Sequence, residues 1–432
     1  MTLRNAASAA AETIPGSAGD TPVGRLTAQP PICLVGPGWR FTSGMSYYTC
    51  RLATAMAGRH HVSVIQLRHL LPRRFYPGRQ RVGQSRARMT YPPHVPVYDG
   101  IDWWWGLSVL RALAFLRARR PAVLVFQWWT AAALHTYLLL AVAGRVLRAR
   151  VVMEIHESQD PGEADLRLVH GYGRWGLRLL LRLCQGCVLH SEADRRMLQN
   201  VGIQLDMPVS IAPHGPYDQY RAVIPTDPPA DAAIAKVRQA PRTAVVNLLF
   251  FGVIRPYKGL EDLLTVFNAL SQEEAAGFWL TVVGETWGGW TGADRLIETS
   301  PHRDRITFVN DYVPDEVAAA AFGHADVVVL PYHRSSSSGP LHVAMSWGLP
   351  VVVTDVGGLR ESARGYGGAV FVPPRDLAGL KAGILQAAAM AGKQFKDPGD
   401  WAQTVEAILA AADVSGPAGE GSHGRNCSCG CR

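Results

Sequence analysis

Residues 325–358 read ADVVVLPYHRSSSSGPLHVAMSWGLPVVVTDVGG and predict a strand, a loop, a helix, a second strand and a turn. The apolar run Val327–Leu330 is typical of a strand buried on both faces, and 351–353 is the next such run. Four serines and Gly339 precede the helix. The serines can cap it, and its first amides and positive dipole end form an anion site. An ordinary serine cap explains this segment equally well, so a ligand does not follow from it alone.

A second segment of the same kind, LLFFGVIRPYKGLEDLL at 248–264, adds two cations. Gly252 ends the expected strand, and Arg255 and Lys258 lie in the loop before a helix that starts at Gly259. Ligands bind at the carboxyl ends of strands in an open parallel sheet. Two fixed cations beside a serine-capped helix start therefore predict a cradle for a diphosphate.

Three motifs resemble the donor-binding domain of glycosyltransferase family 4, whose members are retaining enzymes of the GT-B fold: GVIRPYKGLEDLL, ADVVVLPY and SGPLHVAMSWGLPVVVTDVGGLRE. A weaker likeness covers most of residues 30–412. It implies an α/β chain with two Rossmann-like domains facing across a cleft, and a C-terminal helix that crosses back to the first domain. It also implies that Arg255 and Lys258 hold the diphosphate of a nucleotide-sugar donor.

The chain departs from the family pattern at two positions. The family has a Glu, seven residues and a second Glu in this region, whereas this chain has Ser335 and Val343. The second Glu would bind the ribose, and this chain has no carboxylate at that position. A branch of the family with a serine-glycine pattern in this place is similar, so we do not take the change as loss of activity.

The resemblance also implies which residues surround the substrates. His156 follows the expected strand 151–155 and would lie beside the transferred sugar, acting with Arg255 and Lys258 in catalysis. The alternative is a histidine whose hydrogen bonds are satisfied by its neighbour Glu157 or by a backbone carbonyl. The acceptor side or the cleft would include Ser43, Glu157 and His214. The donor would contact Gly44, Gly252, Arg255, Lys258, Gly284, Ser337, Ser338, Gly339, Pro340 and Leu341.

We expect the following organisation along the chain. Residues 1–29 are expected to be disordered, 30–215 to form the acceptor domain, and 216–243, rich in Pro, Ala and Asp, to be a linker. Residues 244–398 would form the donor domain. The helix that crosses back would be 399–412, followed by a tail at 413–432.

Composition restricts the class of protein. With 48% hydrophobic and 18% charged residues the 432-residue chain is globular. Residues 1–30 lack a continuous apolar core, so we expect no secretory signal. Residues 128–144 are apolar but short for a membrane span, so we expect them to form a buried helix. We expect a cytoplasmic bacterial protein. Ala, Arg and Gly usage suggests a GC-rich genome.

The net charge of +8 includes seven arginines at 68–88 with no acidic residue among them. This loop would suit peripheral contact with the inner face of a membrane or a phosphorylated acceptor; a solvated loop is the alternative, and no nucleic-acid partner is expected. Cys184 and Cys187 have metal-like spacing, but no second pair accompanies them, so they and Cys33 and Cys50 are expected in the core. We assign no function to Cys427, Cys429 and Cys431.

The favoured hypothesis is a retaining hexosyltransferase that moves a sugar from a nucleotide-diphosphate sugar to a glycan, lipid or small molecule, with no metal and no cofactor. Two cations and a helix dipole would stabilise the departing diphosphate. One alternative is a nucleotide-sugar epimerase of GT-B fold, which would need acid and base carboxylates around the sugar. The other is a GT-B-like binding or scaffold protein that has lost turnover. The sequence names neither the sugar nor the base nor the acceptor.

Overall fold

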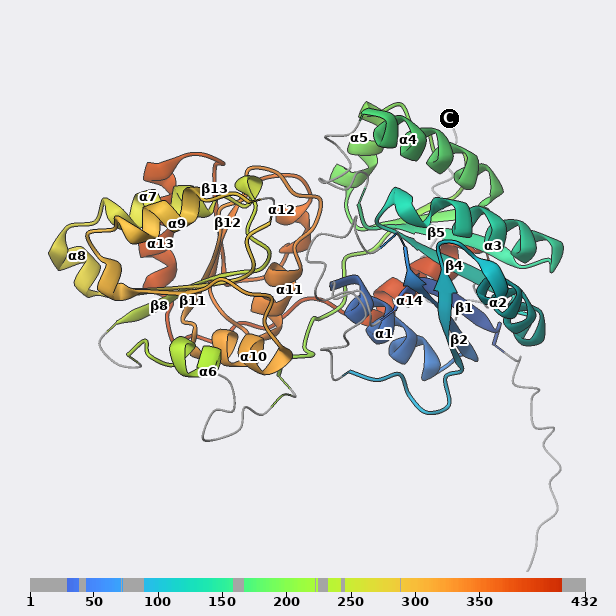
Figure 1. Ribbon diagram of the computed structural model, residues 1–432, viewed down its shortest axis with the longest axis horizontal. Helices are drawn as coiled ribbons and strands as arrows, with labels where there is room; N and C mark the ends of the chain where they lie inside the picture. Colours follow the sequence, from blue (N-terminus) through green and yellow to red (C-terminus); the bar gives the residue numbers. More distant parts are fainter. Residues whose placement is uncertain are drawn as a thin grey trace, which may run out of the picture.

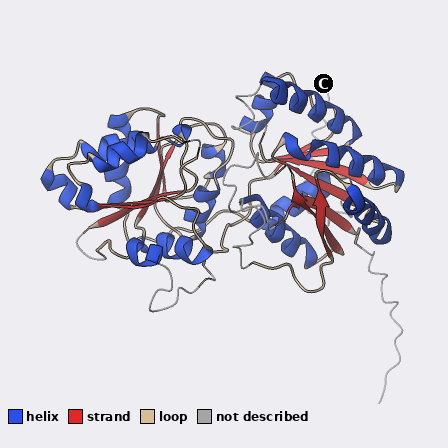
Figure 2. Ribbon diagram, viewed as in Figure 1, coloured by secondary structure: helices blue, strands red, loops and turns tan. Residues whose placement is uncertain are grey.

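The computed structural model describes residues 29–38, 44–70, 72, 89–157, 167–221, 223, 232–241, 245–287 and 289–413. Two parallel sheets form the centres of two units that lie side by side, each with helices on both faces (Figures 1 and 2). Each sheet reverses its strand order once. Such a topological switch point is where open α/β sheets bind ligands.

The first sheet has the strand order β3-β2-β1-β4-β5-β6-β7, with every pair parallel. Its inner strands are rich in apolar residues, as expected for a sheet covered on both faces, whereas the edge strand β3 is more polar. They are β1 (Ile32–Pro37), β2 (Val62–His69), β3 (Val97–Asp102), β4 (Val123–Trp128), β5 (Arg150–Ile155), β6 (Gly186–Leu189) and β7 (Val209–Ile211). The helices are α1 (Gly44–Ala57), α2 (Gly106–Arg119), η3 (Ala131–Ala133), α3 (Leu134–Val146), α4 (Arg167–Leu183) and α5 (Glu192–Asn200).

The second sheet repeats this arrangement with the order β10-β9-β8-β11-β12-β13, again all parallel. Its strands are β8 (Val246–Phe251), β9 (Phe278–Val283), β10 (Ile306–Val309), β11 (Val327–Leu330), β12 (Val351–Thr354) and β13 (Ala369–Val372). The helices are α6 (Ala232–Val237), η4 (Pro256–Lys258), α7 (Leu260–Asn268), α8 (Gln272–Ala276), α9 (Gly292–Glu298), η5 (Arg303–Arg305), α10 (Asp315–His324), α11 (Gly339–Ser346), α12 (Leu359–Ser362) and α13 (Leu377–Ala388).

The last helix, α14 (Trp401–Ala411), leaves the second unit and packs on the first sheet, against α1, β6 and β7 (Figure 1). Asp400 caps it by accepting a hydrogen bond from the Ala402 amide at 2.8 Å. Its close approach requires a glycine in β6, because a Cβ on Gly186 would overlap the Ala411 carbonyl. The expected helix that crosses back is therefore present.

Two elements differ from the sequence expectation. Residues 97–102 form the edge strand β3 beside β2, and this strand was not predicted. Its alternation is broken by Asp99 and Gly100, which hides it in the sequence. The expected linker also contains a helix, α6, which packs against α10 through Ile234 and Val237.

The hydrophobic core divides by sheet face. One cluster lies between the first sheet and α2, α3 and α4, another lies under α7, α9 and α13, and the largest joins the inner faces of both units through α1, α10, α11 and α14. The four described cysteines are buried free thiols, as expected for core residues. Among the described residues no helix is long and apolar enough to cross a membrane.

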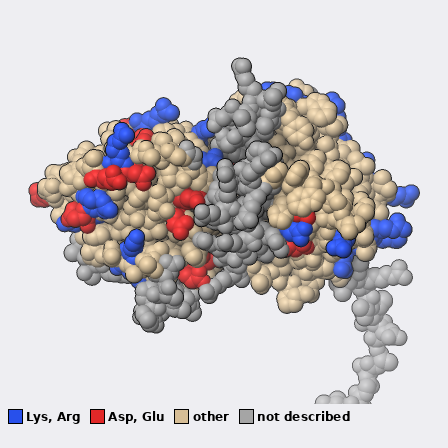
Figure 3. All heavy atoms as spheres, in the orientation of Figure 1, with Lys and Arg blue, Asp and Glu red and all other residues tan. Residues whose placement is uncertain are grey.

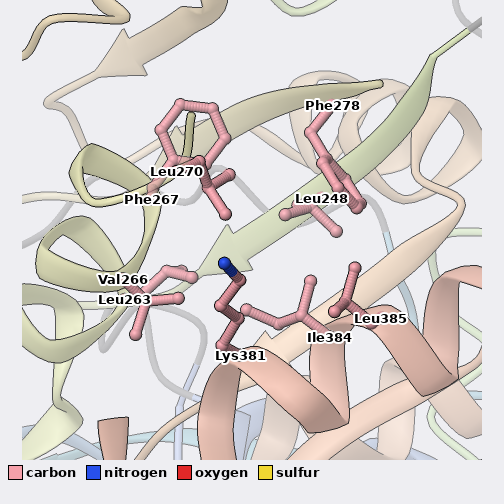
Figure 4. Close-up of a pocket in the computed structure, with 9 residues that line it drawn as sticks. All are labelled: Leu248, Leu263, Val266, Phe267, Leu270, Phe278, Lys381, Ile384 and Leu385. Carbon is pink, nitrogen blue, oxygen red and sulfur yellow. The ribbon is translucent and has the colours of Figure 1, made fainter. Parts of the chain in front are cut away.

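A small gap remains in the hydrophobic core of the second unit, between α7, β8 and α13. There the ammonium of Lys381 extends over apolar side chains (Figure 4). Its volume is about 10 Å³, and its lining is otherwise entirely hydrophobic. Lys381 is held by an ion pair of 2.7 Å with Glu274. A space of this size barely holds one water, so it is a packing defect and not a ligand site.

A candidate active site in the cleft between the two sheets

A cleft of about 400 Å³ lies between the two units, lined by the carboxyl ends of strands from both sheets. The first unit contributes the start of α1, the residues after β4 and β5, and the loop around His214. The second contributes the residues after β8, β9 and β10 and the start of α11. The cleft thus joins the switch points of two parallel sheets, where ligands are expected.

Both predicted cations line this cleft from the loop after β8. The guanidinium of Arg255 lies 4.7 Å from the centre of the Trp287 ring, and the ammonium of Lys258 lies 3.9 Å from that of Tyr332. Burial acts to lower the pKa of Lys258, but Tyr332 and Tyr257 outweigh it and raise that pKa above its ordinary value. Aromatic faces therefore hold two charged cations at the cleft wall.

Two glycines allow the backbone to approach this wall closely. Gly252 and Gly284 follow β8 and β9, and both have positive φ, 117° and 157°. A Cβ on Gly284 would overlap the carbonyl of Gly252. Both residues line the cleft, so larger side chains would fill the space beside Arg255.

The start of α11 forms the next part of the wall, with Ser337, Gly339 and Pro340 on the cleft. Ser338 is buried and serves as the helix cap, because its Oγ accepts from the Leu341 amide at 3.3 Å. Leu341 is also buried, so these two predicted contacts support the cleft from behind. Pro340 has no amide hydrogen, which leaves the Gly339 amide as the first-turn donor beside the cleft.

The two substituted family positions have different surroundings. Ser335 does not line the cleft, and its hydroxyl donates to the Ser337 carbonyl at 2.6 Å within the serine loop. Val343 does line the cleft and is only 3% exposed. An apolar surface therefore stands where the resemblance would place a ribose-binding carboxylate.

Other carboxylates reach the cleft instead: Glu157, Glu285, Asp311 and Asp315. Glu285 follows β9 and accepts a short hydrogen bond from the Trp287 indole. Asp315 begins α10 and accepts a short hydrogen bond from the Tyr47 hydroxyl of α1, which ties the two units together at the rim. The cleft therefore contains acidic groups on both sides.

His156 follows β5, lines the cleft and lies above a buried carboxylate. Glu154, two residues earlier on the same face of the strand, lies 3.6 Å from His156 Nε2 and accepts a short hydrogen bond from Tyr48. Burial acts to raise the pKa of Glu154, but His156, His190 and Tyr48 outweigh it and lower that pKa. An ionised carboxylate thus lies beneath the cleft beside the His156 ring, near its Nε2 but beyond hydrogen-bond distance.

His190 holds the other side of the His156 ring. Its Nδ1–H donates to the Ala212 carbonyl at 2.9 Å, so its Nε2 accepts from His156 Nδ1 at 3.0 Å. Burial lowers the pKa of His190 to about 3, so this ring is neutral. The result is a fixed orientation for His156.

His214 lines the cleft opposite α11, and its ring stacks on that of buried His342 at 4.8 Å. Its Nδ1 lies 3.0 Å from the Tyr217 hydroxyl. The Nε2 atoms of His214 and His342 are buried without a partner among the described residues. The His214 nitrogen is available to a hydroxyl group of a bound sugar, whereas His342 does not line the cleft.

His156, His190 and His214 offer ring nitrogens within 4.8 Å of one another, which raises the question of a metal. Both nitrogens of His190 are already engaged. Within the described part of this trio, only His156 and His214 keep a ring nitrogen that forms no hydrogen bond to protein. Catalytic zinc sites use three protein ligands, so the trio fits a hydrogen-bonded network better than a metal site.

The structure thus brings most of the predicted site together. Eleven of the predicted residues line one cleft: His156, Arg255, Lys258, Gly44, Gly252, Gly284, Ser337, Gly339, Pro340, Glu157 and His214. Ser43, most of the 68–88 loop and Cys427, Cys429 and Cys431 lie outside the described residues.

Sequence reasoning missed the support beneath His156 and much of the acidic and aromatic lining. The missed residues include Tyr48, Glu154, Tyr217, Tyr220, Trp287, Asp311 and Asp315. A signal existed for Glu154, which is an acidic residue inside an apolar strand and two positions from His156. Asp311 and Trp287 also follow strands closely, whereas nothing local marks Tyr48.

Comparison with known families gives two matches. Residues 246–389 match the profile described as "Glycosyl transferases group 1", and residues 43–212 match "Glycosyl transferase 4-like domain". The two matches fall on the two sheets of the structure.

Similar curated proteins are bacterial glycosyltransferases. The GDP-mannose:glycolipid 4-beta-D-mannosyltransferase of Xanthomonas campestris is 37% identical over 107 residues, which are 24% of this chain and 29% of that protein. The D-inositol 3-phosphate glycosyltransferase of Geodermatophilus obscurus is 30% identical over 197 residues, 42% and 43% of the two chains. The glycogen synthase of Mycobacterium tuberculosis is 32% identical over 146 residues, which are 33% of this chain and 34% of that protein. The chain therefore spans less than half the length of these relatives.

Solved structures with the same architecture cover more of the chain. Sucrose-phosphate synthase from Thermosynechococcus elongatus has a TM-score of 0.59 at 18% identity, covering 89% of this chain and 95% of that one. Anabaena HepE in complex with UDP-glucose has a TM-score of 0.57 at 15% identity, covering 89% and 99%. The expected GT-B fold is confirmed.

Proposed function

Because the chain belongs to the family of group 1 glycosyl transferases, we propose that this glycosyltransferase moves a hexosyl group from a nucleotide-diphosphate sugar to an acceptor. We further propose that transfer retains the anomeric configuration and needs no metal or other cofactor. The observation that carries this is the shared cleft: Arg255 and Lys258 lie on one wall and His156 and His214 on the other. A donor held on the cations would present its sugar to the histidines.

The donor belongs to the unit built on residues 244–398 in this proposal. Arg255, Lys258 and the Gly339 amide bind the diphosphate and stabilise the negative charge that develops as it leaves. Gly252 and Gly284 leave room for it. Val343 offers the ribose no hydrogen bond, so we assign that contact to the carboxylates after β9 and β10, Glu285 or Asp311.

The acceptor belongs to the unit built on residues 30–215. His156, oriented by Glu154 and His190, positions the sugar or the attacking hydroxyl. The leaving diphosphate takes up the acceptor's proton on the same face, because the retained configuration requires attack from the side on which the donor departs. This route on one face gives the cleft carboxylates Glu157, Glu285, Asp311 and Asp315 no role as nucleophiles.

The acceptor's class is guided by the relatives, which act on a glycolipid, an inositol phosphate and a glycan according to their names. We propose a glycan, lipid-linked or small-molecule acceptor of this range. Nucleotide sugars are cytoplasmic compounds, so we place the reaction in the cytoplasm, with the 68–88 loop at the inner membrane face.

A direct test is transfer and donor hydrolysis with UDP-, GDP-, ADP- and TDP-sugars, together with thermal stability in the presence of each. A bound donor at a hundred times its dissociation constant adds about 2.7 kcal/mol of stability. We expect one nucleotide to stabilise the chain and to be consumed. Excess EDTA should leave turnover unchanged, and NMR of the product should show the anomeric configuration of the donor.

The matched variants are Arg255→Ala, Lys258→Ala and, as a control, Arg334→Ala. Each of the first two removes a charge-assisted hydrogen bond to the diphosphate, worth about ten- to a hundred-fold in donor affinity. Arg334 is exposed on the neighbouring loop, lies 5.3 Å from the centre of the Tyr257 ring and does not line the cleft, so its loss should change donor affinity much less than the loss of Arg255 or Lys258. Binding without turnover would favour a scaffold protein, and C2 inversion of the free donor would favour an epimerase.

A further inference from the structure

Three neighbouring helices of the first unit share an unusual outer surface. α2, α3 and α4 cover the same face of the sheet, and α3 contacts both of the others (Figure 1). Their outward faces carry exposed large hydrophobic side chains: Leu107 at 68%, Leu110 at 60%, Val142 at 48%, Val146 at 77%, Tyr172 at 46% and Trp175 at 62%. Trp104, just before α2, is 55% exposed. These seven are most of the ten such residues in the described part of the chain.

The charged residues of the three helices themselves have one sign, although Asp160, Glu163 and Asp165 precede α4 in the part of the chain that the structure does not describe. Residues 103–153 contain seven arginines and no acidic residue. Residues 167–191 also contain no acidic residue. Arg111, Arg117, Arg119, Arg145 and Arg182 are exposed beside the hydrophobic side chains. In Figure 3 the outer edge of this unit shows basic atoms with few acidic ones. The surface is therefore both apolar and cationic.

We propose that the outer face of α2, α3 and α4 docks on an anionic lipid bilayer. Leucine, valine and aromatic side chains insert at the level of the head groups, while arginines contact lipid phosphates, as in interfacial amphipathic helices. Isolated exposed hydrophobic residues are normal in proteins, but seven on one layer with only basic charge are not scattered. A second copy of the chain is a poor occupant, because two cationic faces repel each other.

The docking face borders the cleft. Trp103–Trp105 follow β3 and pack on the start of α3, since the Trp105 indole donates to Thr136 at 3.0 Å. Trp129, just before η3, lines the cleft itself, and α4 contacts η3. A bilayer on this face would thus lie beside the mouth of the cleft. If the proposed transferase function holds, a lipid-linked acceptor reaches the site from the membrane without leaving it.

The test is sedimentation of the full chain with vesicles of phosphatidylcholine alone or mixed with phosphatidylglycerol. We expect at least ten-fold stronger binding to the anionic vesicles, reduced at about 1 M salt, where charges are screened within about 3 Å. Leu107→Ser with Leu110→Ser, and separately Arg117→Glu with Arg119→Glu, should each weaken binding ten-fold or more. The matched control, Leu377→Ser with Leu385→Ser, alters exposed leucines of α13 in the other unit and should bind like the unaltered chain.

Each result decides the proposal. The proposal would be overturned if the unaltered chain did not bind vesicles, or if the α2 variants bound them as well as it does. It would also be overturned if the unaltered chain ran as a dimer in size-exclusion chromatography and Leu107→Ser with Leu110→Ser made it a monomer. Thermal melts show that the variants fold. Hydrolysis of a soluble nucleotide sugar should be the same in all of them, because α2 lies outside the cleft. Vesicle binding without donor turnover would support the membrane-docking proposal and refute the proposed transferase function. Donor turnover without vesicle binding would support the transferase function and refute membrane docking.

Discussion

Buried histidines make the site sensitive to acid. Burial lowers the pKa of His190 to about 3, that of His342 to about 4, and that of His214 well below its ordinary value. In the unfolded chain these side chains titrate near pH 6.5. Between about pH 6.5 and 4 the unfolded state therefore binds more protons than the folded state, and the folded state loses stability as the pH falls.

We expect the free energy of unfolding to decrease by about 1.4 kcal/mol per pH unit for each of these histidines below about pH 6.5. Burial raises the pKa of Asp194 to about 6, so this carboxyl group makes the folded state more stable as the pH falls. Its effect is opposite to that of the histidines, but it is one group and they are three. Urea denaturation between pH 7.5 and 5 measures the slope. In His190→Gln the slope of the unfolding free energy against pH should decrease by the contribution of one histidine. In the control His94→Gln, on an exposed loop, the slope should be that of the unaltered chain.

The residues that hold ligands were more predictable than those that support them. His156 follows β5 directly, Arg255 and Lys258 lie in the loop after β8, and strand ends meet at one edge of a parallel sheet. Glu154 was not predicted as part of the site, because its role depends on Tyr48, which lies 106 positions earlier. Contacts of this kind come from packing, and local pattern does not contain them.

At the level of the elements, α14 depends on a glycine in the strand it crosses. Gly186→Ala would place a Cβ on the Ala411 backbone, and backbone cannot move aside as a flexible side chain can. We expect a loss of about 1 to 3 kcal/mol in the free energy of unfolding, typical of overpacking, measured by thermal or urea denaturation.

The control for this substitution is another glycine of the same unit. Gly171 in α4 is exposed, and a Cβ there would meet nothing within 4 Å. Gly171→Ala should therefore be neutral or stabilise the chain by up to about 1 kcal/mol, since alanine favours helix. Equal stability of Gly186→Ala and the unaltered chain would show that α14 does not press on β6.

The sequence predicted elements best where apolar runs are continuous. The strand Val327–Leu330 has the expected bounds, and Val351–Thr354 extends the expected run 351–353 by one residue, because burial on both faces gives an unbroken apolar run. β3 was missed because only its last three residues are buried, and its first half follows a proline-rich stretch. An edge strand owes its place to its neighbour, which a single segment does not reveal.

For the molecule as a whole, polar contacts across the cleft hold the two units together. Glu361 of α12 accepts hydrogen bonds from the Glu192 and Ala193 amides at 2.7 and 3.1 Å, so a carboxylate from the second unit caps α5 of the first. The Tyr47 hydroxyl of α1 donates a short hydrogen bond to Asp315 of α10. Ser346 at the end of α11 donates to the Tyr217 carbonyl at 2.8 Å. Such contacts set how far the cleft is closed.

Glu361→Ala should shift the free chain towards an open arrangement. A carboxylate at a helix N-terminus contributes about 0.3 to 1 kcal/mol, and its hydrogen bonds to the amides add to this, so we expect about a five-fold change in the ratio of closed to open molecules. Small-angle scattering of the free protein should then give a larger radius of gyration. Since donor contacts both walls of the cleft in our proposal, the apparent donor affinity should fall by up to the same factor.

Asp355→Ala is the matched control, because Asp355 is an exposed carboxylate on the same unit that pairs at 2.8 Å with Arg360. It removes the same charge without touching α5, so the radius and the donor affinity should stay those of the unaltered chain. Saturating donor should bring Glu361→Ala back to the compact radius, because a ligand that binds the closed arrangement better shifts the population towards it. An unchanged radius in the free Glu361→Ala protein would mean that the apolar core shared by α1, α11 and α14 fixes the closure by itself.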